Sequence, residues 1–135
     1  MDAEDARRRV ASARVGRLAT VTSDGGPHVV PCCFAVVGDV IATAVDDVKR
    51  KSTGALRRLD NVRANPRATL LVDHYDDDWS ALWWVRVDGA ARLLDHGDER
   101  EALLDALVAK YEEYVARRPP GAVIALDATR WTAWP

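Results

Sequence analysis

The feature that most constrains the fold is a succession of short β-type runs joined by tight turn sequences. Residues 16–23 (GRLATVTS) and 27–37 (PHVVPCCFAVV) flank the turn sequence DGG, and a second turn, GD, leads into the run 40–45. Runs this close together pair as antiparallel hairpins, because a parallel pair needs a crossover of a dozen or more residues. Pro31 cannot donate to a sheet ladder, so it predicts an edge strand or a bulge within the second run.

Further β-type runs and helical segments alternate along the rest of the chain. The β-type runs cover residues 67–74, 81–94 and 122–134, and the helical segments cover 2–13, 53–64 and 98–117. Hairpin-linked strands in a chain of 135 residues favour one small domain with a closed or split antiparallel barrel. We therefore expect a single domain over residues 1–135, with a mainly β (α+β) fold: a six-stranded antiparallel split β-barrel with flanking helices.

Composition excludes several classes of function. The net charge of −2 argues against general nucleic-acid binding, which usually needs a basic domain. No apolar run approaches the ~20 residues of a membrane span, and the N-terminus lacks a signal-peptide apolar region, so we expect a cytoplasmic protein without a membrane partner. Cys32 and Cys33 are neighbours that would point to opposite faces of a strand, which predicts a structural pair rather than a disulfide or a metal site.

Signatures of side-chain catalysis are missing from the sequence. It contains no Walker loop, no GxSxG and no HExxH motif, and His28, His74 and His96 stand far apart without ligand spacing. Residues 76–78 (DDD) are interpreted as a polar loop rather than a cation site. We expect no metal site and no catalytic side chain, which is typical of proteins whose bound cofactor performs the chemistry.

Tryptophans on both faces of one strand predict that something covers the outside of the barrel. In the run 81–87 (ALWWVRV), Trp83 and Trp84 must point to opposite sides of the sheet. A barrel interior covers only one of these faces. A helix could cover the other, but we favour a second copy of the chain, because tryptophan and tyrosine concentrate at interfaces.

A basic block between two β-type runs is the best candidate for a ligand site. Seven of the 19 Lys and Arg residues lie between positions 49 and 67, against a single acid, Asp60: they are Lys49, Arg50, Lys51, Arg57, Arg58, Arg63 and Arg67. Arg58 and Asn61, three positions apart, would share one face of the expected helix. Cationic side chains at a helix start suit a phosphate-bearing ligand, whereas the alternative is a solvated helix face.

Three segments together carry a resemblance to a known family. They are GRLATVTSDGGPHVVP, VDDVKRKSTGALRRLDNVRANPRATLLVD and HYDDDWSALWWVRVDGAARLL. Over residues 16–94 the chain resembles the split-barrel flavin and deazaflavin family of pyridoxamine-phosphate-oxidase-like proteins. Within that family it is most similar to the small oxidoreductases that use the deazaflavin coenzyme F420.

The resemblance implies a set of cofactor-binding residues. Lys49, Lys51 and Arg58 would hold the cofactor phosphate, with Asn61 close by; because the loop before residue 59 is longer here than in short relatives, the second phosphate contact stays open between Lys49, Lys51 and Arg57. The resemblance further places His28, Val30, Pro31, Thr43 and Ala44 along the cofactor groove, and Trp79 of a second subunit against the cofactor.

The function that this resemblance implies is oxidoreductase activity in a homodimer. F420 would exchange a hydride with an unsaturated small-molecule substrate, and a water molecule or His28 would supply a proton. Two alternatives stay open. The first is a protein of the same fold that binds flavin mononucleotide (FMN), and the second is a non-catalytic cofactor carrier or dimerisation domain.

Overall fold

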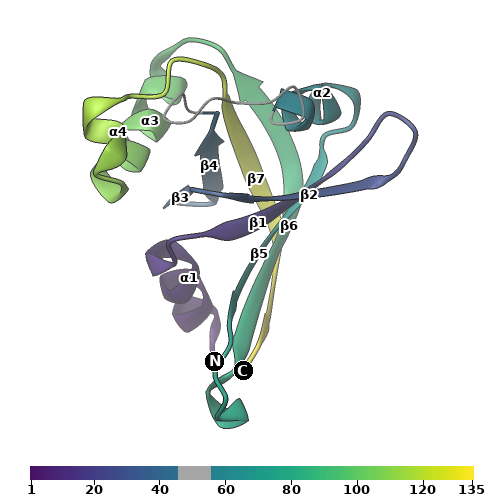
Figure 1. Ribbon diagram of the computed structural model, residues 1–135, viewed down its shortest axis with the longest axis vertical. Coiled ribbons are helices and arrows are strands. Elements are labelled where there is room, and N and C mark those ends of the chain that lie inside the picture. The colour runs from purple at the N-terminus through teal and green to yellow at the C-terminus, as the bar shows by residue number, and fades with distance from the viewer. Residues whose placement is uncertain (46–55) are drawn as a thin grey trace.

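The structure, a computed structural model, describes residues 1–45 and 56–135. Seven strands of this described chain form one antiparallel sheet in the order β2-β1-β5-β6-β7-β4-β3 (Figure 1). Their bounds are β1 Gly16–Val21, β2 Pro27–Cys32, β3 Ala35–Val37, β4 Val40–Ala44, β5 Arg67–His74, β6 Trp83–Leu94 and β7 Val123–Trp134. The predicted mainly β fold is confirmed. The predicted number of six strands is wrong, and the sheet is open, because β2 and β3 are its two edges.

The additional strand arises because the run 27–37 is divided at Cys33 and Phe34. Phe34 is fully buried, and its backbone N–H donates to the Tyr111 hydroxyl at 3.1 Å. Its carbonyl accepts from Lys110 Nζ at 2.9 Å. These side chains satisfy the backbone groups that a continuous strand would pair in a ladder. As a result, β2 and β3 separate to opposite edges of the sheet, and Pro31 lies on an edge strand as predicted.

The last strand of the chain occupies an interior position in the sheet. β7 lies between β6 and β4, so the β3–β4 hairpin joins the sheet only through β7. The register between β6 and β7 shifts at Asp88 and Gly89. A Cβ at Gly89 would lie 2.1 Å from the carbonyl oxygen of Asp127, so this crossing requires glycine.

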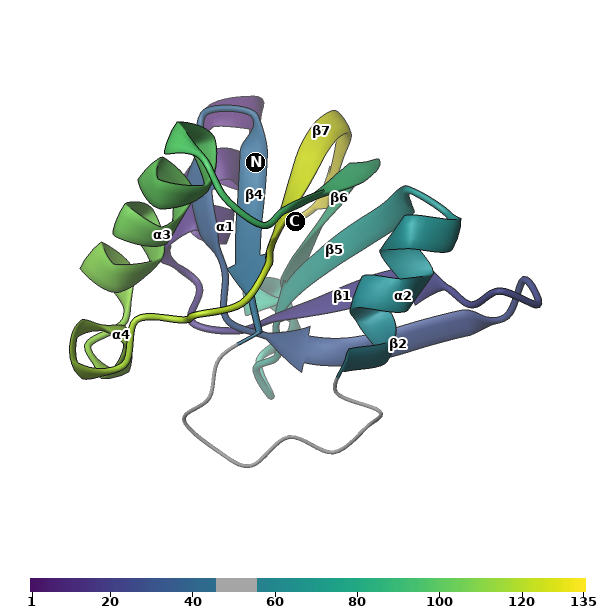
Figure 2. The same cartoon turned by 90° about the horizontal axis from the view of Figure 1, so that it is seen from above.

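The helices lie around the sheet rather than within it (Figure 2). Their bounds are α1 Ala3–Ser12, α2 Arg57–Ala64, α3 Asp98–Lys110 and α4 Glu113–Ala116, and a short 3₁₀ helix, η2, covers Trp79–Ala81. The predicted helix 98–117 is interrupted at Tyr111 and Glu112, where the chain turns from α3 into α4. The predicted start of the middle helix at residue 53 lies outside the described residues. None of the described helices is long and apolar enough to cross a membrane.

Two apolar clusters hold these layers together. The larger one lies between α1 and the face of the sheet opposite to solvent, with Phe34, Leu70, Val85 and Val87 at or near zero exposure. The second lies between α3 and the β3–β4–β7 part of the sheet and includes Leu104. Full burial of each large aliphatic side chain stabilises the fold by about 1.5–3 kcal/mol, so these clusters fix both the sheet and the helices on it.

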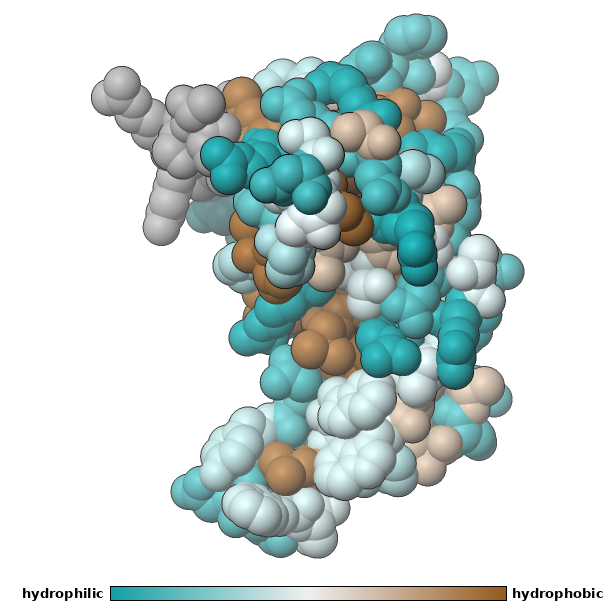
Figure 3. All heavy atoms as spheres, turned by 90° about the vertical axis from the view of Figure 1, so that its right-hand side faces the viewer, coloured by the Kyte–Doolittle hydropathy of each residue, from teal (hydrophilic) through white to brown (hydrophobic). Residues whose placement is uncertain are grey.

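Trp83 and Trp84 point to opposite sides of the sheet, as predicted. Trp83 faces α1, where the Arg9 guanidinium lies 5.1 Å from its ring centre. Trp84 lies on the other side, which we call the outer face, beside its cross-strand neighbour Trp134. Trp134 is 47% exposed and Val29 on β2 is 59% exposed, so the outer face leaves apolar side chains open to solvent. Figure 3, in which the right-hand side of Figure 1 faces the viewer, shows brown apolar atoms there and pale aromatic side chains gathered at the lower end.

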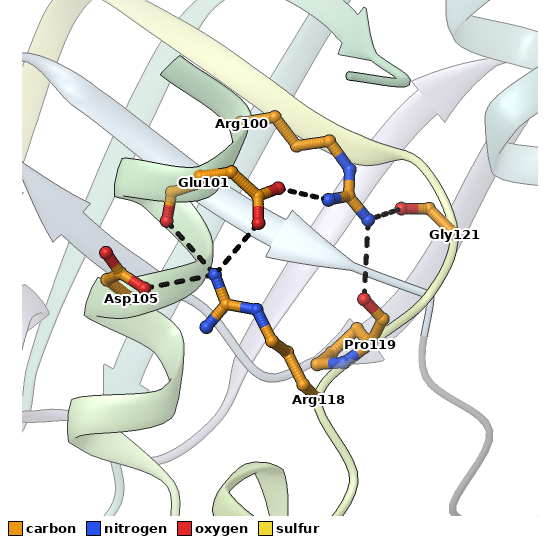
Figure 4. A network of polar contacts seen from close by, with 6 residues as sticks. All are labelled: Arg100, Glu101, Asp105, Arg118, Pro119 and Gly121. Carbon is orange, nitrogen blue, oxygen red and sulfur yellow. Dashed lines mark hydrogen bonds and ion pairs between the residues drawn. The ribbon is translucent and has the colours of Figure 1, made fainter. Parts of the chain in front are cut away.

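A largely buried arginine side chain fixes the loop that leads into β7 (Figure 4). The Arg100 side chain, only 11% exposed, donates from one terminal nitrogen to the carbonyls of Pro119 and Gly121, at 3.4 and 2.8 Å. Arg118 reaches back to α3, where it forms ion pairs with Glu101 at 3.3 Å and Asp105 at 3.0 Å. The loop is therefore held from both of its sides, which sets the position where β7 starts.

Candidate functional site

Helix α2 turns the two residues of the predicted phosphate site toward the sheet. Arg58 and Asn61 lie on one face of the helix and are 8% and 4% exposed. Asn61 Nδ2 donates to the hydroxyl of Thr20 on β1 at 3.1 Å, which attaches the helix to the sheet. Arg58 is thus not part of a solvated helix face, and that alternative is wrong for this residue.

Two buried nitrogen atoms beside this helix have no hydrogen-bond partner within the described chain. They are Nε of Arg58 and Nδ1 of His28. His28 lies on β2 directly across from Thr20, the residue that Asn61 contacts. Arg58 also acts on the end of β2: burial raises the pKa of the Cys32 thiol, and the Arg58 charge opposes that rise. A buried guanidinium is costly unless it is paired, so the arrangement favours an additional anionic partner.

A pocket of about 390 Å³ opens between the first turn of α2 and the turn that joins β1 to β2. It is lined by Thr22, Ser23, Asp24, Arg57, Asp60 and Asn61. The Thr22 hydroxyl, the Gly26 N–H and the Arg57 charge, the last of these the weakest, hold the pKa of the exposed Asp24 carboxyl below its usual value. The pocket therefore combines Arg57 and Asn61 from the predicted set with two acids, and it borders the buried Arg58.

The other predicted site residues are distributed over three places. On β2, Val30 is half-buried and Pro31 is exposed. On β4, the Thr43 hydroxyl donates to the Cys33 carbonyl at 2.7 Å, and Ala44 packs in the cluster under α3. Lys49 and Lys51 lie outside the described residues.

Trp79 lies far from the rest of the predicted set within one chain. It is 71% exposed and belongs to η2, in the connection between β5 and β6 at the lower end of Figure 1, whereas α2 is at the upper end. The structure thus brings Arg57, Arg58, Asn61 and His28 together in one chain, and it leaves Trp79 at the opposite end of the sheet.

Sequence reasoning missed two features around this site. One is Thr20, a buried polar residue. The only hint in the sequence was that Thr20 alternates along β1 with the other inward-facing positions. The other is a larger pocket of about 740 Å³ on the outer face, between the β1–β2 turn and the β6–β7 register shift. We call it the arginine pocket, because Arg67, Arg86 and Arg130 line it; its other charged lining residue is Asp88. These residues come from three different strands, so no local sequence motif predicts the pocket.

Residues 3–135 match the family model described as pyridoxamine 5′-phosphate oxidase. The chain belongs to this family, and the resemblance noted in its sequence is confirmed. No curated protein matches the chain.

Solved structures show the same fold at low sequence identity. A conserved hypothetical protein from Mycobacterium tuberculosis is 20% identical, with a TM-score of 0.79 over 99% of this chain and 84% of that one. A heme binding protein from Mycobacterium smegmatis is 24% identical, with a TM-score of 0.78 over 97% of this chain and 52% of that one. A protein described as an F420 reductase is 21% identical, with a TM-score of 0.68 over 93% of this chain and 94% of that one.

Proposed function

We propose that this protein is an F420-dependent oxidoreductase that holds the cofactor phosphate at the junction of α2 with β1 and β2. The observation that carries the proposal is the Arg58 guanidinium, on a residue only 8% exposed, with an Nε that has no partner among the described residues. A phosphate oxygen is the kind of acceptor that this group lacks. Asn61 fixes the helix on Thr20, so Arg58 would meet the anion without a costly rearrangement.

The residues around Arg58 fit a ligand that is anionic at one end and planar at the other. Arg57 and Asn61 line the adjoining pocket and would extend the contact with the anionic tail. The edge strand β2, with His28 and Val30 half-buried on its inward side, offers a surface for the ring. When bound, F420 supplies or accepts the hydride, and His28 Nδ1, which has no partner among the described residues, is where this chain could hold a proton for the substrate.

A second copy of the chain completes the site in this proposal. Trp79 is exposed at the end of the sheet opposite to α2, so it can reach a cofactor at α2 only from another subunit. The exposed apolar residues of the outer face give such a subunit a surface on which to pack. We therefore propose a homodimer, in the cytoplasm, with a small unsaturated molecule as substrate.

Cofactor titration tests this proposal directly. The purified full chain is titrated with F420, FMN and heme, following the fluorescence of the first two and the absorbance of the third. The proposal expects F420 to bind more tightly than either competitor. Tight FMN binding without F420 binding would favour the flavin alternative, and heme as the only ligand would favour the activity named for one of the similar structures.

Turnover separates an enzyme from a cofactor carrier. The protein is mixed with reduced F420 and a panel of quinones and conjugated ketones, and the loss of reduced cofactor is followed optically. Acceleration with at least one acceptor supports the oxidoreductase. Tight F420 binding with no acceleration over the whole panel would favour the carrier.

A further inference from the structure

The arginine pocket carries more positive charge than its own residues can neutralise. The Asp88 carboxylate accepts from the Thr69 hydroxyl at 2.6 Å and from Arg86 Nε at 3.3 Å. Over residues 1–45 and 56–135, no ion pair is formed by the Arg67 or Arg130 side chain, and both residues are exposed. The pocket therefore presents two guanidinium groups without an ion-pair partner among the described residues, in a hollow of about 740 Å³.

The far end of the same strand pair carries the opposite charge. We call residues 76–79 the acidic tip, because Asp76, Asp77 and Asp78 precede Trp79 there. Asp78 accepts from the N–H and hydroxyl of Ser80, at 3.0 and 2.7 Å, and Asp76 accepts from the Asp78 N–H at 2.8 Å. Asp77 is exposed and has no partner among the residues that the structure describes. Its carboxylate is free to meet a cation outside the chain.

The positions of these two sites suit a twofold arrangement of copies. β5 runs from Arg67 in the arginine pocket to His74, just before the acidic tip, which is roughly 24 Å at 3.4 Å per residue. A twofold axis that lies just outside the outer face, parallel to it and perpendicular to β5 near the middle of the strand, stacks two copies face to face and brings opposite ends of their β5 strands together. In such an isologous contact, the tip of each copy meets the pocket of the other.

We infer that the acidic tip of one copy docks in the arginine pocket of a second copy, and the reverse, so that each homodimer contains two identical ionic contacts. Asp77 would face Arg67 and Arg130. The apolar part of the outer face, with Leu71 and Trp84, lies between the two contacts and would be covered by the partner. This inference rests on the homodimer of the proposed function, and it adds the residues that set the orientation of the two subunits.

The same docking would place Trp79, next to the acidic tip, at the pocket end of the partner. The arginine pocket and the α2 pocket are neighbours along the β1–β2 hairpin, since Thr20 and Val21 line the first and Thr22 and Ser23 the second. The ionic contact would therefore act as a positioning device for Trp79 and has no part in the chemical step.

Charge reversal in separate and mixed subunits tests the inference. Asp77→Arg and Arg67→Glu are each measured by sedimentation at about 50 mM salt, where exposed charges are weakly screened. Each variant alone should dimerise at least tenfold more weakly than wild type, because both contacts then join like charges. An equimolar mixture should recover the wild-type dimer. In a mixed dimer, one contact joins the introduced arginine to the introduced glutamate, and the other joins the native Asp77 to the native Arg67. Asp95→Arg, the same charge change at an exposed site away from both clusters, is the control and should dimerise normally.

Each other outcome has a definite meaning. If Asp77→Arg or Arg67→Glu dimerises as wild type, or if the mixture does not recover, the docking is overturned while the homodimer stands. If wild type is monomeric at all concentrations, both the docking and the homodimer of the proposed function are overturned. Circular dichroism of each variant separates weaker association from unfolding, and Arg67→Gln, which removes the charge without reversing it, should give an intermediate effect.

Discussion

Replacing Arg58 by methionine should change cofactor affinity and the stability of the free protein in opposite directions. The residue is 8% exposed and its Nε has no partner in the described chain, so the cofactor-free fold holds a poorly compensated charge. Methionine fills a similar space without that charge. Replacement of buried ionic groups by apolar ones often stabilises a fold by about 1–4 kcal/mol. We expect a gain near the lower end of this range, or a rise in Tm of roughly 3–5 °C per kcal/mol.

The loss of affinity follows from the contact that the arginine would make. A hydrogen bond to a charged group contributes about 1.5–3 kcal/mol, so Arg58→Met should weaken cofactor binding roughly 10- to 150-fold. Thermal unfolding of the free protein gives the stability, and a fluorescence titration gives the affinity. Arg63→Met is the matched control on the same helix: its side chain is 56% exposed and forms a surface ion pair with Asp60, so neither quantity should change by much.

The reasoning would be refuted by an unchanged affinity in Arg58→Met together with an unaltered fold. An affinity loss of the same size in Arg63→Met would also contradict it, because it would indicate a general electrostatic effect of the helix. A Tm that falls sharply in the free Arg58→Met protein would mean that the guanidinium already has a strong partner outside the described residues.

Three further changes have distinct expected outcomes. Gly89→Ala should destabilise the protein by about 3 kcal/mol or more in urea unfolding, since its Cβ would lie 2.1 Å from the Asp127 carbonyl, whereas Gly121→Ala, with 3.8 Å to the nearest atom, should be tolerated. Burial lowers the pKa of Lys110 to about 8, so its charge opposes folding below pH 8. As pH rises from about 8 to 10.5, the wild type should gain stability relative to Lys110→Met. A difference in unfolding free energy that stays constant over this pH range would refute the prediction. Trp79→Ala should leave Tm unchanged and weaken cofactor binding in the dimer, and an equal loss of affinity in a monomeric form would disprove the contribution of a second subunit.

Local signals in the sequence were sufficient for most of the strands. The DGG turn between two β-type runs predicted the β1–β2 hairpin, and Pro31 predicted its position at an edge of the sheet. The break at Phe34 could not be predicted in this way. It depends on the hydroxyl of Tyr111, which follows the end of α3 and lies 77 residues farther along the chain. The same tertiary contact ends α3 before α4, where the sequence favoured one continuous helix.

In the candidate site too, features set by neighbouring residues were predicted, and features set by residues far apart in the sequence were not. The three-residue spacing of Arg58 and Asn61 predicted a shared helix face, but only the contact with Thr20 shows that this face is buried. The arginine pocket was not predicted, because the register shift at Gly89 and three separate strands bring its residues together. Trp79 was identified through family resemblance alone, and its role stays a prediction.

The interior position of β7 has a consequence for synthesis on the ribosome. The strand that joins the β3–β4 hairpin to the rest of the sheet is made after all the others. A nascent chain that ends before Val123 therefore lacks the ladder on which that hairpin depends, and it exposes the apolar side of α3 that Ala125 would cover. Cooperative folding of the sheet must wait until residues 123–134 have emerged, so chaperones that shield emerging chains would meet an incomplete sheet before that point.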